Sequence, residues 1–272
     1  MKRRRFFDSS RVEKEAERNL DRKREAEKLR ELLGEIAKIL RNQQIPVDDE
    51  CRVDMKSFSI IYGDPRIDLD IQRVRESKKG RNANNLEDRL LTDGERLEVL
   101  KTIIFHKFLG EKFFVVRSSV YDDLTNNVDN LIVEKETGNI VCAFDEVSSF
   151  GKDYEKKQNK VLYINLRGGA RLKYGFISDG SLLILQGIKN IPIFYLSLSP
   201  EFIDKGIKKL SSNLNEISDF ERKLIEYFLK ILLNQIQQLK LIKSLNQTLA
   251  QRIESFRQYL ENKSWKISEG VL

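Results

Sequence analysis

The hydrophobic period of this chain changes twice, and this change constrains the fold more than any other feature. Between residues 113 and 198 the apolar residues come in short, strand-like runs separated by turns that contain Gly. Before and after this segment they recur at spacings of three and four, which is typical of amphipathic helices. The sequence therefore predicts an α/β (α+β) fold in which helices flank a sheet.

The longest helical patterns lie at the two ends of the chain. Residues 8–42 predict one charged helix that begins with a capping box of Ser10 and Glu13. Residues 217–264 contain neither Pro nor Gly and predict a second helical stretch, about 70 Å long if continuous. Its Leu and Ile residues recur like a coiled-coil seam, so we expect it to pack on the N-terminal helix or on a second chain. The predicted parts are a charged helix (1–45), an α/β core (46–212) and a long C-terminal helix (213–272).

Shorter elements are predicted between these ends. Thr92 and Glu95 form a second capping box at the start of a helix, and residues 79–85 predict a loop. The remaining helices are expected over 67–79, 93–109, 152–164 and 200–212, and strands over 113–118, 128–134, 139–147, 172–178, 181–187 and 191–198.

Histidine and cysteine are too scarce for several kinds of metal site. The 272 residues include one histidine, His106, and two cysteines, Cys51 and Cys142, which form no CxxC motif. This excludes a zinc protease with two histidines on one helical turn and argues against a structural zinc site. No glycine-rich nucleotide-binding loop of the GxxxxGK[ST] or GxGxxG type is present either. A metal enzyme of this composition would hold its metal with carboxylates, which suits Mg²⁺ or Mn²⁺.

The overall charge permits a polyanionic partner. Lys and Arg number 49 against 42 Asp and Glu, which gives a formal net charge of +7. No apolar run approaches the ~20 residues of a membrane span. The first residues, MKRRRFF, are basic, but no apolar segment follows them. We therefore expect a cytoplasmic protein without membrane contact.

Acidic residues interrupt the apolar strands of the predicted hairpin. Asp129 opens its first strand, and Asp145 and Glu146 close its second. A two-residue turn at Thr137-Gly138 would place Asp129 opposite Glu146, whereas a longer turn or a bulge would place Asp145 opposite instead. Like charges directly opposite each other are unfavourable, and a divalent cation between them would convert this cost into a binding site.

The order helix, strand, acidic hairpin, helix, strand resembles the core of the PD-(D/E)XK nucleases, over about residues 90–178. The resemblance implies a restriction-endonuclease-like mixed sheet and a site for Mg²⁺ (or Mn²⁺) that activates water for DNA hydrolysis. It makes Asp129 the first acid and Asp145 or Glu146 the second. It also implies that Glu98, on the preceding helix, supports the metal.

The chain departs from this family at its lysine, which is expected two residues after the second acid. Val147 or Ser148 occupies that position here. In some members the lysine comes from the next helix, which in this chain contains four lysines. Lys156 and Lys160 share a helix face at i, i+4 and are our catalytic candidates. The missing lysine also fits a core that binds nucleic acid without cutting it.

Further candidates surround the hairpin. Asp122 and Asp123 are either a second acidic pair or a turn with side-chain caps. Cations beside the hairpin and around Gly168-Gly169 are candidates for binding DNA phosphates, or they only border the join between a helix and a strand. These cations are Arg117, Arg167, Arg171 and Lys173.

The leading hypothesis is a Mg²⁺-dependent deoxyribonuclease with an elongated helical extension. One alternative is a non-catalytic nucleic-acid-binding or scaffold protein with a degenerate nuclease core. Another is an interaction protein whose C-terminal helix forms a homodimer. Acids within apolar strands argue against the last hypothesis, which has no use for them.

Overall fold

The structure, a computed structural model, describes residues 9–78, 92–148, 152–178, 182–242 and 245–268. The helices are α1 (Ser9–Asn42), η1 (Met55–Phe58), α2 (Ser59–Tyr62), α3 (Asp64–Lys78), α5 (Asp93–Leu109), α6 (Val120–Asn126), α7 (Lys152–Leu166), α8 (Pro200–Lys209), α9 (Asp219–Lys240) and α10 (Gln247–Ser268). The strands are β1 (Phe113–Arg117), β2 (Asn130–Glu134), β3 (Ile140–Val147), β4 (Ala170–Ser178), β5 (Leu183–Ile191) and β6 (Ile193–Ser197).

The expected sheet is present, and it is mixed. Its strand order is β1-β2-β3-β6, in which the first three strands are antiparallel and β6 runs parallel to β3. Strands β4 and β5 form a separate two-stranded sheet. The strand that joins the sheet after α7 is therefore β6 and not the predicted strand at 172–178, which forms part of β4.

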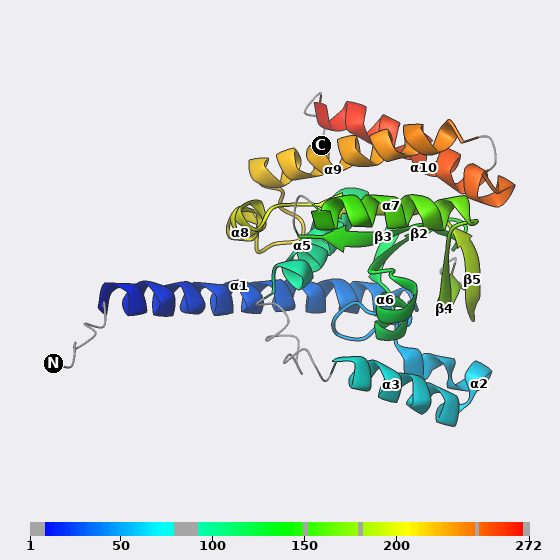
Figure 1. Ribbon diagram of the computed structural model, residues 1–272, viewed down its shortest axis with the longest axis horizontal. Helices are drawn as coiled ribbons and strands as arrows, with labels where there is room; N and C mark the ends of the chain where they lie inside the picture. The colour runs from blue at the N-terminus through cyan, green and yellow to red at the C-terminus, as the bar shows by residue number, and fades with distance from the viewer. Residues whose placement is uncertain (1–8, 79–91, 149–151, 179–181, 243–244, 269–272) are drawn as a thin grey trace.

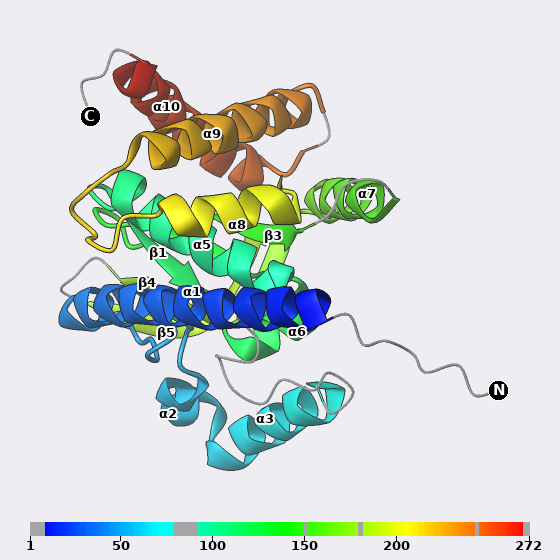
Figure 2. The same cartoon turned by 90° about the vertical axis from the view of Figure 1, so that its left-hand side faces the viewer.

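Helices cover both faces of the four-stranded sheet (Figures 1 and 2). Phe144 of β3 and Phe194 of β6 are register partners and point to one face. Phe105 of α5 contacts the first ring at 5.4 Å, and Phe256 of α10 contacts the second at 6.2 Å. The next residue of β6, Tyr195, points to the other face, where α7 lies. Successive residues of β3 therefore face different helices.

The outer edge of β6 is closed by α9. The side-chain amide of Gln235 accepts a hydrogen bond from the Tyr195 backbone N–H at 3.1 Å and donates one to its carbonyl at 2.8 Å. This side chain replaces the missing neighbouring strand, because an open edge would leave both backbone groups unpaired.

The C-terminal region is a helical hairpin, so the prediction of one continuous helix over 217–264 was wrong. Helix α9 ends at Lys240, and α10 begins at Gln247 and packs against α9 (Figure 1). Asn246 caps the second helix by accepting a hydrogen bond from the Leu249 N–H. The regular seam packs within the chain, and buried members on both helices are Leu232, Ile236, Leu239, Leu249, Ile253, Phe256 and Leu260.

Most other predicted elements are confirmed. The N-terminal helix is α1, whose fully buried residues in its second half include Leu29, Leu33, Ile36 and Leu40. The predicted loop at 79–85 and the side chains of Ser10 and Glu13 lie outside the described residues. Helix α6 is an addition, because the sequence favoured only a turn there. In the described part of the chain, no helix combines the length and apolarity needed to cross a membrane.

Candidate active site at the end of the hairpin

A register shift in the hairpin decides which acid lies opposite Asp129. Strands β2 and β3 change register after Ile132, which leaves one extra residue in β3. Asn130 then lies opposite Phe144. The Asp129 N–H donates to the Phe144 carbonyl at 2.7 Å and the Asp129 carboxylate accepts from the Glu146 N–H at 2.8 Å, so Asp129 lies across from the segment that contains Asp145. Of the two predicted alternatives, the structure supports the one that depends on a bulge.

Asp145 faces α7 and pairs with two of its lysines. Its carboxylate contacts Lys157 Nζ, and Lys160 Nζ lies 3.4 Å from Oδ2. Asp145 is 5% exposed, whereas Lys157 is 19% and Lys160 is 40% exposed. The two lysines are three residues apart, so both lie on one face of the helix. They connect a buried carboxylate with the surface.

Glu146 faces the opposite way, toward α5. Its carboxylate pairs with Lys101, which is fully buried and lies 4.5 Å from the centre of the Phe144 ring. Burial lowers the pKa of Lys101 to about 7, although the charges of Asp129 and Glu98 oppose this shift. Glu146 therefore takes part in the site through its backbone, whose N–H donates to Asp129 Oδ2 at 2.8 Å.

Asp129 lies among more negative than positive charges. It is half-buried, and this burial raises its pKa well above the usual value. The nearby charges of Glu98, Asp123 and Asp145 raise the pKa further, against the opposing charge of Lys157. A carboxylate in such surroundings binds a proton or another cation strongly.

Glu98 is held by two buried arginines. Arg117 Nε lies 2.8 Å and an Arg52 nitrogen 3.2 Å from Glu98 Oε1. Both arginines also contact Glu95, and Arg52 contacts Asp123 at 3.2 Å. Their pKa values are raised because these acids outweigh the effect of burial. Arg117 is 0% exposed, so the structure places this predicted DNA-binding residue inside the ion-pair network.

Lys156, a predicted catalytic residue, lies away from the acids. Its side chain is 78% exposed and pairs with Asp153, one helical turn earlier, at 3.3 Å. The sequence could not distinguish it from Lys157, because both have a partner at Lys160, four or three residues ahead. The rotation of α7 about its axis relative to β3 places Lys157, and not Lys156, beside Asp145.

The other predicted phosphate-binding residues are dispersed. Arg167 and Arg171 are exposed, whereas Lys173 lies among tyrosine rings and pairs with the buried Asp70. Asp122 bridges two elements, because its carboxylate accepts hydrogen bonds from the backbone N–H groups of Lys173 and Tyr174. It is therefore not part of a second acidic pair.

No known family model, curated protein or solved structure significantly matches this chain.

Sequence reasoning missed Arg52, Lys101 and Lys157. A weak signal existed for Lys101, which is a lone cation within an apolar helical segment at 97–105. No signal in the sequence links Arg52 to Glu98, because tertiary packing alone brings them together.

Across the described residues, no group of three or more His, Cys, Asp or Glu side chains is gathered in a way that could hold a metal ion. The acidic residues of the site instead have different partners. Glu98 pairs with arginines, Glu146 pairs with Lys101, and Asp129 and Asp145 remain together at the end of the hairpin.

Proposed function

We propose that this protein is a metal-dependent nuclease that hydrolyses phosphodiester bonds in DNA. The observation that carries the proposal is the pair Asp129 and Asp145 at the end of the hairpin, with Lys157 and Lys160 of α7 beside Asp145. Two hard oxygen donors next to two cations suit a phosphate group and a divalent metal. The succession of α5, β1, β2, β3, α7 and β6, with α6 inserted after β1 and the β4-β5 pair before β6, also supports the resemblance to the PD-(D/E)XK core.

The residues fit Mg²⁺ or Mn²⁺. Mg²⁺ is commonly held by one or two carboxylates together with water and substrate phosphates, so a group of three protein acids is not required. Asp129 and Asp145 would hold the ion, and the position of Asp129 among other carboxylates supports this role. When bound, the metal supplies charge stabilisation and lowers the pKa of water.

The two lysines have different exposures and therefore different proposed roles. Lys157, mostly buried against Asp145, orients the carboxylate and places a positive charge beside the attacking water. Lys160 is more exposed and binds a phosphate oxygen of the substrate. Helix α7 would thus supply the charge that the family usually places on the strand.

The test is cleavage of plasmid and single-stranded DNA in the presence of Mg²⁺ or Mn²⁺. Asp145→Asn removes the charge that both lysines contact, and we expect activity to fall by at least about a hundredfold. Asp153→Asn is the matched control, because Asp153 lies at the start of α7, is 74% exposed and pairs with Lys156. This control should retain full activity.

Three outcomes of this experiment test the proposed nuclease activity and its site. Loss of cleavage in Asp145→Asn with normal cleavage in the control supports the proposed site. Equal cleavage by both variants would remove Asp145 from the chemistry. No cleavage by the unmodified protein with either metal and either substrate would contradict the proposed reaction.

A second candidate function is nucleic-acid binding without cleavage. The specific observation in its favour is that Glu98, the third acid that the resemblance implies, already pairs with Arg52 and Arg117. A site that has lost one metal-supporting acid to ion pairs could still bind phosphates through Lys157 and Lys160. DNA binding that persists without divalent metal, combined with no cleavage, favours this candidate.

A further inference from the structure

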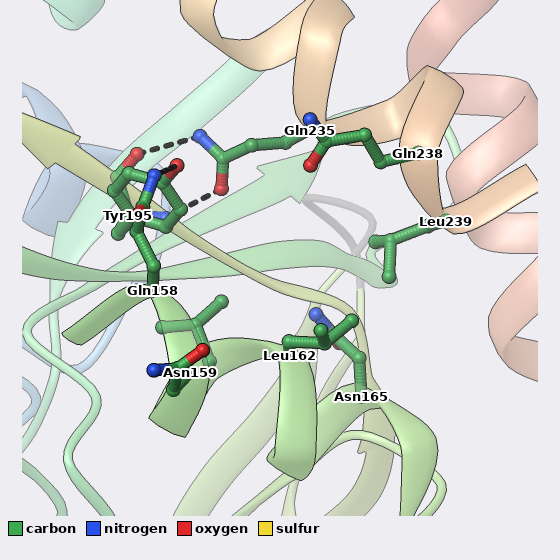
Figure 3. Close-up of a pocket in the computed structure, with 9 residues that line it drawn as sticks. Gln158, Asn159, Leu162, Asn165, Tyr195, Gln235, Gln238 and Leu239 are labelled. Atoms are coloured by element: carbon green, nitrogen blue, oxygen red, sulfur yellow. Dashed lines mark hydrogen bonds between the residues drawn. The ribbon is translucent and has the colours of Figure 1, made fainter. Parts of the chain in front are cut away.

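A groove of about 270 Å³ lies next to the acidic site, between α7, β6 and α9. Figure 3 shows Asn159, Leu162 and Asn165 on one side and Gln235, Gln238 and Leu239 on the other. Gln158, Val161 and Tyr195 complete its described lining.

The groove and the proposed phosphate site share two elements. Tyr195, which lines the groove, is the register partner of Asp145 in the neighbouring parallel strand. Adjacent strands are about 4.8 Å apart, and paired residues point to the same face of the sheet. Gln158 of the groove directly follows Lys157 in α7. Because Asp145, which both Lys157 and Lys160 contact, lies one strand away from Tyr195, a ligand held by these lysines can reach the groove.

The walls of the groove are held in place by their own hydrogen bonds. Gln158 Nε2 donates to the Tyr195 hydroxyl at 2.5 Å. Asn165 is buried and bonds both backbone groups of Ile193, at 2.7 and 3.0 Å. Gln235 is fixed in the same way by the backbone of Tyr195. The groove is thus preformed (Figure 3).

The chemistry of the lining selects a flat, polar and uncharged ligand. Among the described residues that line the groove, none carries a charge, so neither an anion nor a cation finds a counter-charge there. Leu162 and Leu239 offer apolar surface, and the exposed amides of Asn159 and Gln238 offer both donors and acceptors. A nucleobase combines a flat apolar face with a polar edge of this kind.

We propose that this groove binds one unstacked base of single-stranded nucleic acid, whose neighbouring phosphate lies on Lys157 and Lys160. The inference rests on the proposed function, because it takes the substrate to be a nucleic acid. It specifies that the substrate is single-stranded at this position, since a base paired within a duplex cannot enter the groove.

The test compares two labelled single strands of about 12 nucleotides, one normal and one without bases, by fluorescence anisotropy in EDTA to prevent cleavage. The unmodified protein should bind the normal strand about tenfold more tightly, because binding of one base contributes about that factor. Leu162→Ala and Gln238→Ala should remove most of this preference while leaving affinity for the base-free strand unchanged.

Matched controls are available on the same helices. Leu166 is exposed one turn beyond Leu162 on α7, and Gln237 is the exposed neighbour of Gln238 on α9; neither lines this groove. Leu166→Ala and Gln237→Ala should retain the full preference for the normal strand.

Several results would overturn the proposal. These are equal affinity of the unmodified protein for both strands, preference retained in Leu162→Ala and Gln238→Ala, or an isolated deoxynucleoside bound as tightly as the strand. The proposed nuclease site fails separately, if affinity for the base-free strand survives Lys157→Ala combined with Lys160→Ala.

Discussion

Two aspartates of this protein lie near lysines but have opposite electrostatic surroundings. Asp70 of α3 is 0% exposed and accepts hydrogen bonds from Lys173 and from the Tyr174 hydroxyl, the latter at 2.7 Å. Burial alone would raise its pKa, but these two donors and the Lys173 charge lower it overall. Asp129 is half-buried, and neighbouring carboxylates reinforce the effect of this burial and raise its pKa.

The difference separates a structural ion pair from a carboxylate that lies among other acids. Lys173 lies 5.1 to 5.4 Å from the centres of three tyrosine rings, so α3 and β4 are joined by a closed cluster of charge and aromatic rings. Asp129 has no comparable set of donors among the described residues, apart from the Glu146 N–H. Burial of an acid alone does not make it a functional candidate, whereas a pKa raised by neighbouring acids in a shared site does.

The largest expected difference between the two aspartates is in catalysis. Asp129→Asn should lower metal-dependent cleavage by at least about a hundredfold, because it removes a proposed metal ligand. Asp70→Asn should leave the cleavage rate per folded molecule unchanged. Single-turnover cleavage at saturating Mn²⁺ measures both, and a similar loss in the two variants would abolish the distinction.

Stability should show the reverse order. Asp70→Asn leaves Lys173 without its carboxylate and should lower the free energy of unfolding by about 3 kcal/mol. Asp129→Asn relieves repulsion from neighbouring acids, so we expect its stability without metal to be equal to or higher than that of the unmodified protein. Urea unfolding in EDTA provides the comparison. A large destabilisation by Asp129→Asn would indicate a structural role.

The two acids should also respond oppositely to pH. A raised pKa in the folded chain means that the contribution of Asp129 is present below the unfolded value, 3.8, and is lost as the pH rises toward the folded value, by about 1.4 kcal/mol per unit. Asp70, whose pKa is lowered, contributes above 3.8 and loses this contribution as the pH falls.

The measurement is the pH profile of unfolding for the unmodified protein and Asp129→Asn. The difference between the profiles isolates Asp129 from His106, whose pKa burial lowers to about 4 and which titrates in the same range. Mg²⁺ at about ten times its dissociation constant should add about 1.4 kcal/mol to the unmodified protein at neutral pH. It should add nothing to Asp129→Asn, and an equal gain in both would place the ion elsewhere.

The smallest effect is expected from the exposed arginines. Arg167→Ala and Arg171→Ala should each reduce the salt dependence of single-strand binding by at most about 0.7 in the slope of log K against log salt. Lys160→Ala should produce a change of this size and also lower cleavage. Anisotropy titrations over a range of salt concentrations test this prediction. A larger effect from the arginines would indicate that the phosphates of the strand bind at the surface near Arg167 and Arg171.

The sequence predicted the elements better than their connections. Periodicity located the helices, the strands and the acidic hairpin, because these depend on local patterns. It did not fix the register, since the shift after Ile132 has no signal in the residue types. Nor did it reveal that Arg52 and Arg117 form ion pairs with Glu98, or that β4 and β5 form a separate sheet. Both features depend on contacts between distant segments.

The extra residue in β3 has a consequence for how freely the hairpin can vary. It divides the strand into two halves, and the faces to which the side chains of one half point do not depend on those of the other half. The half near the turn follows the loop geometry, and the half that holds Asp145 and Glu146 follows the helices that supply their partners. The turn can therefore be lengthened or exchanged without rotating the acids, provided that the irregularity absorbs the change. An insertion of one residue after Phe144 would not be absorbed in this way. It would turn Asp145 and Glu146 to opposite faces of the sheet, so that each would lie near the lysine partner of the other.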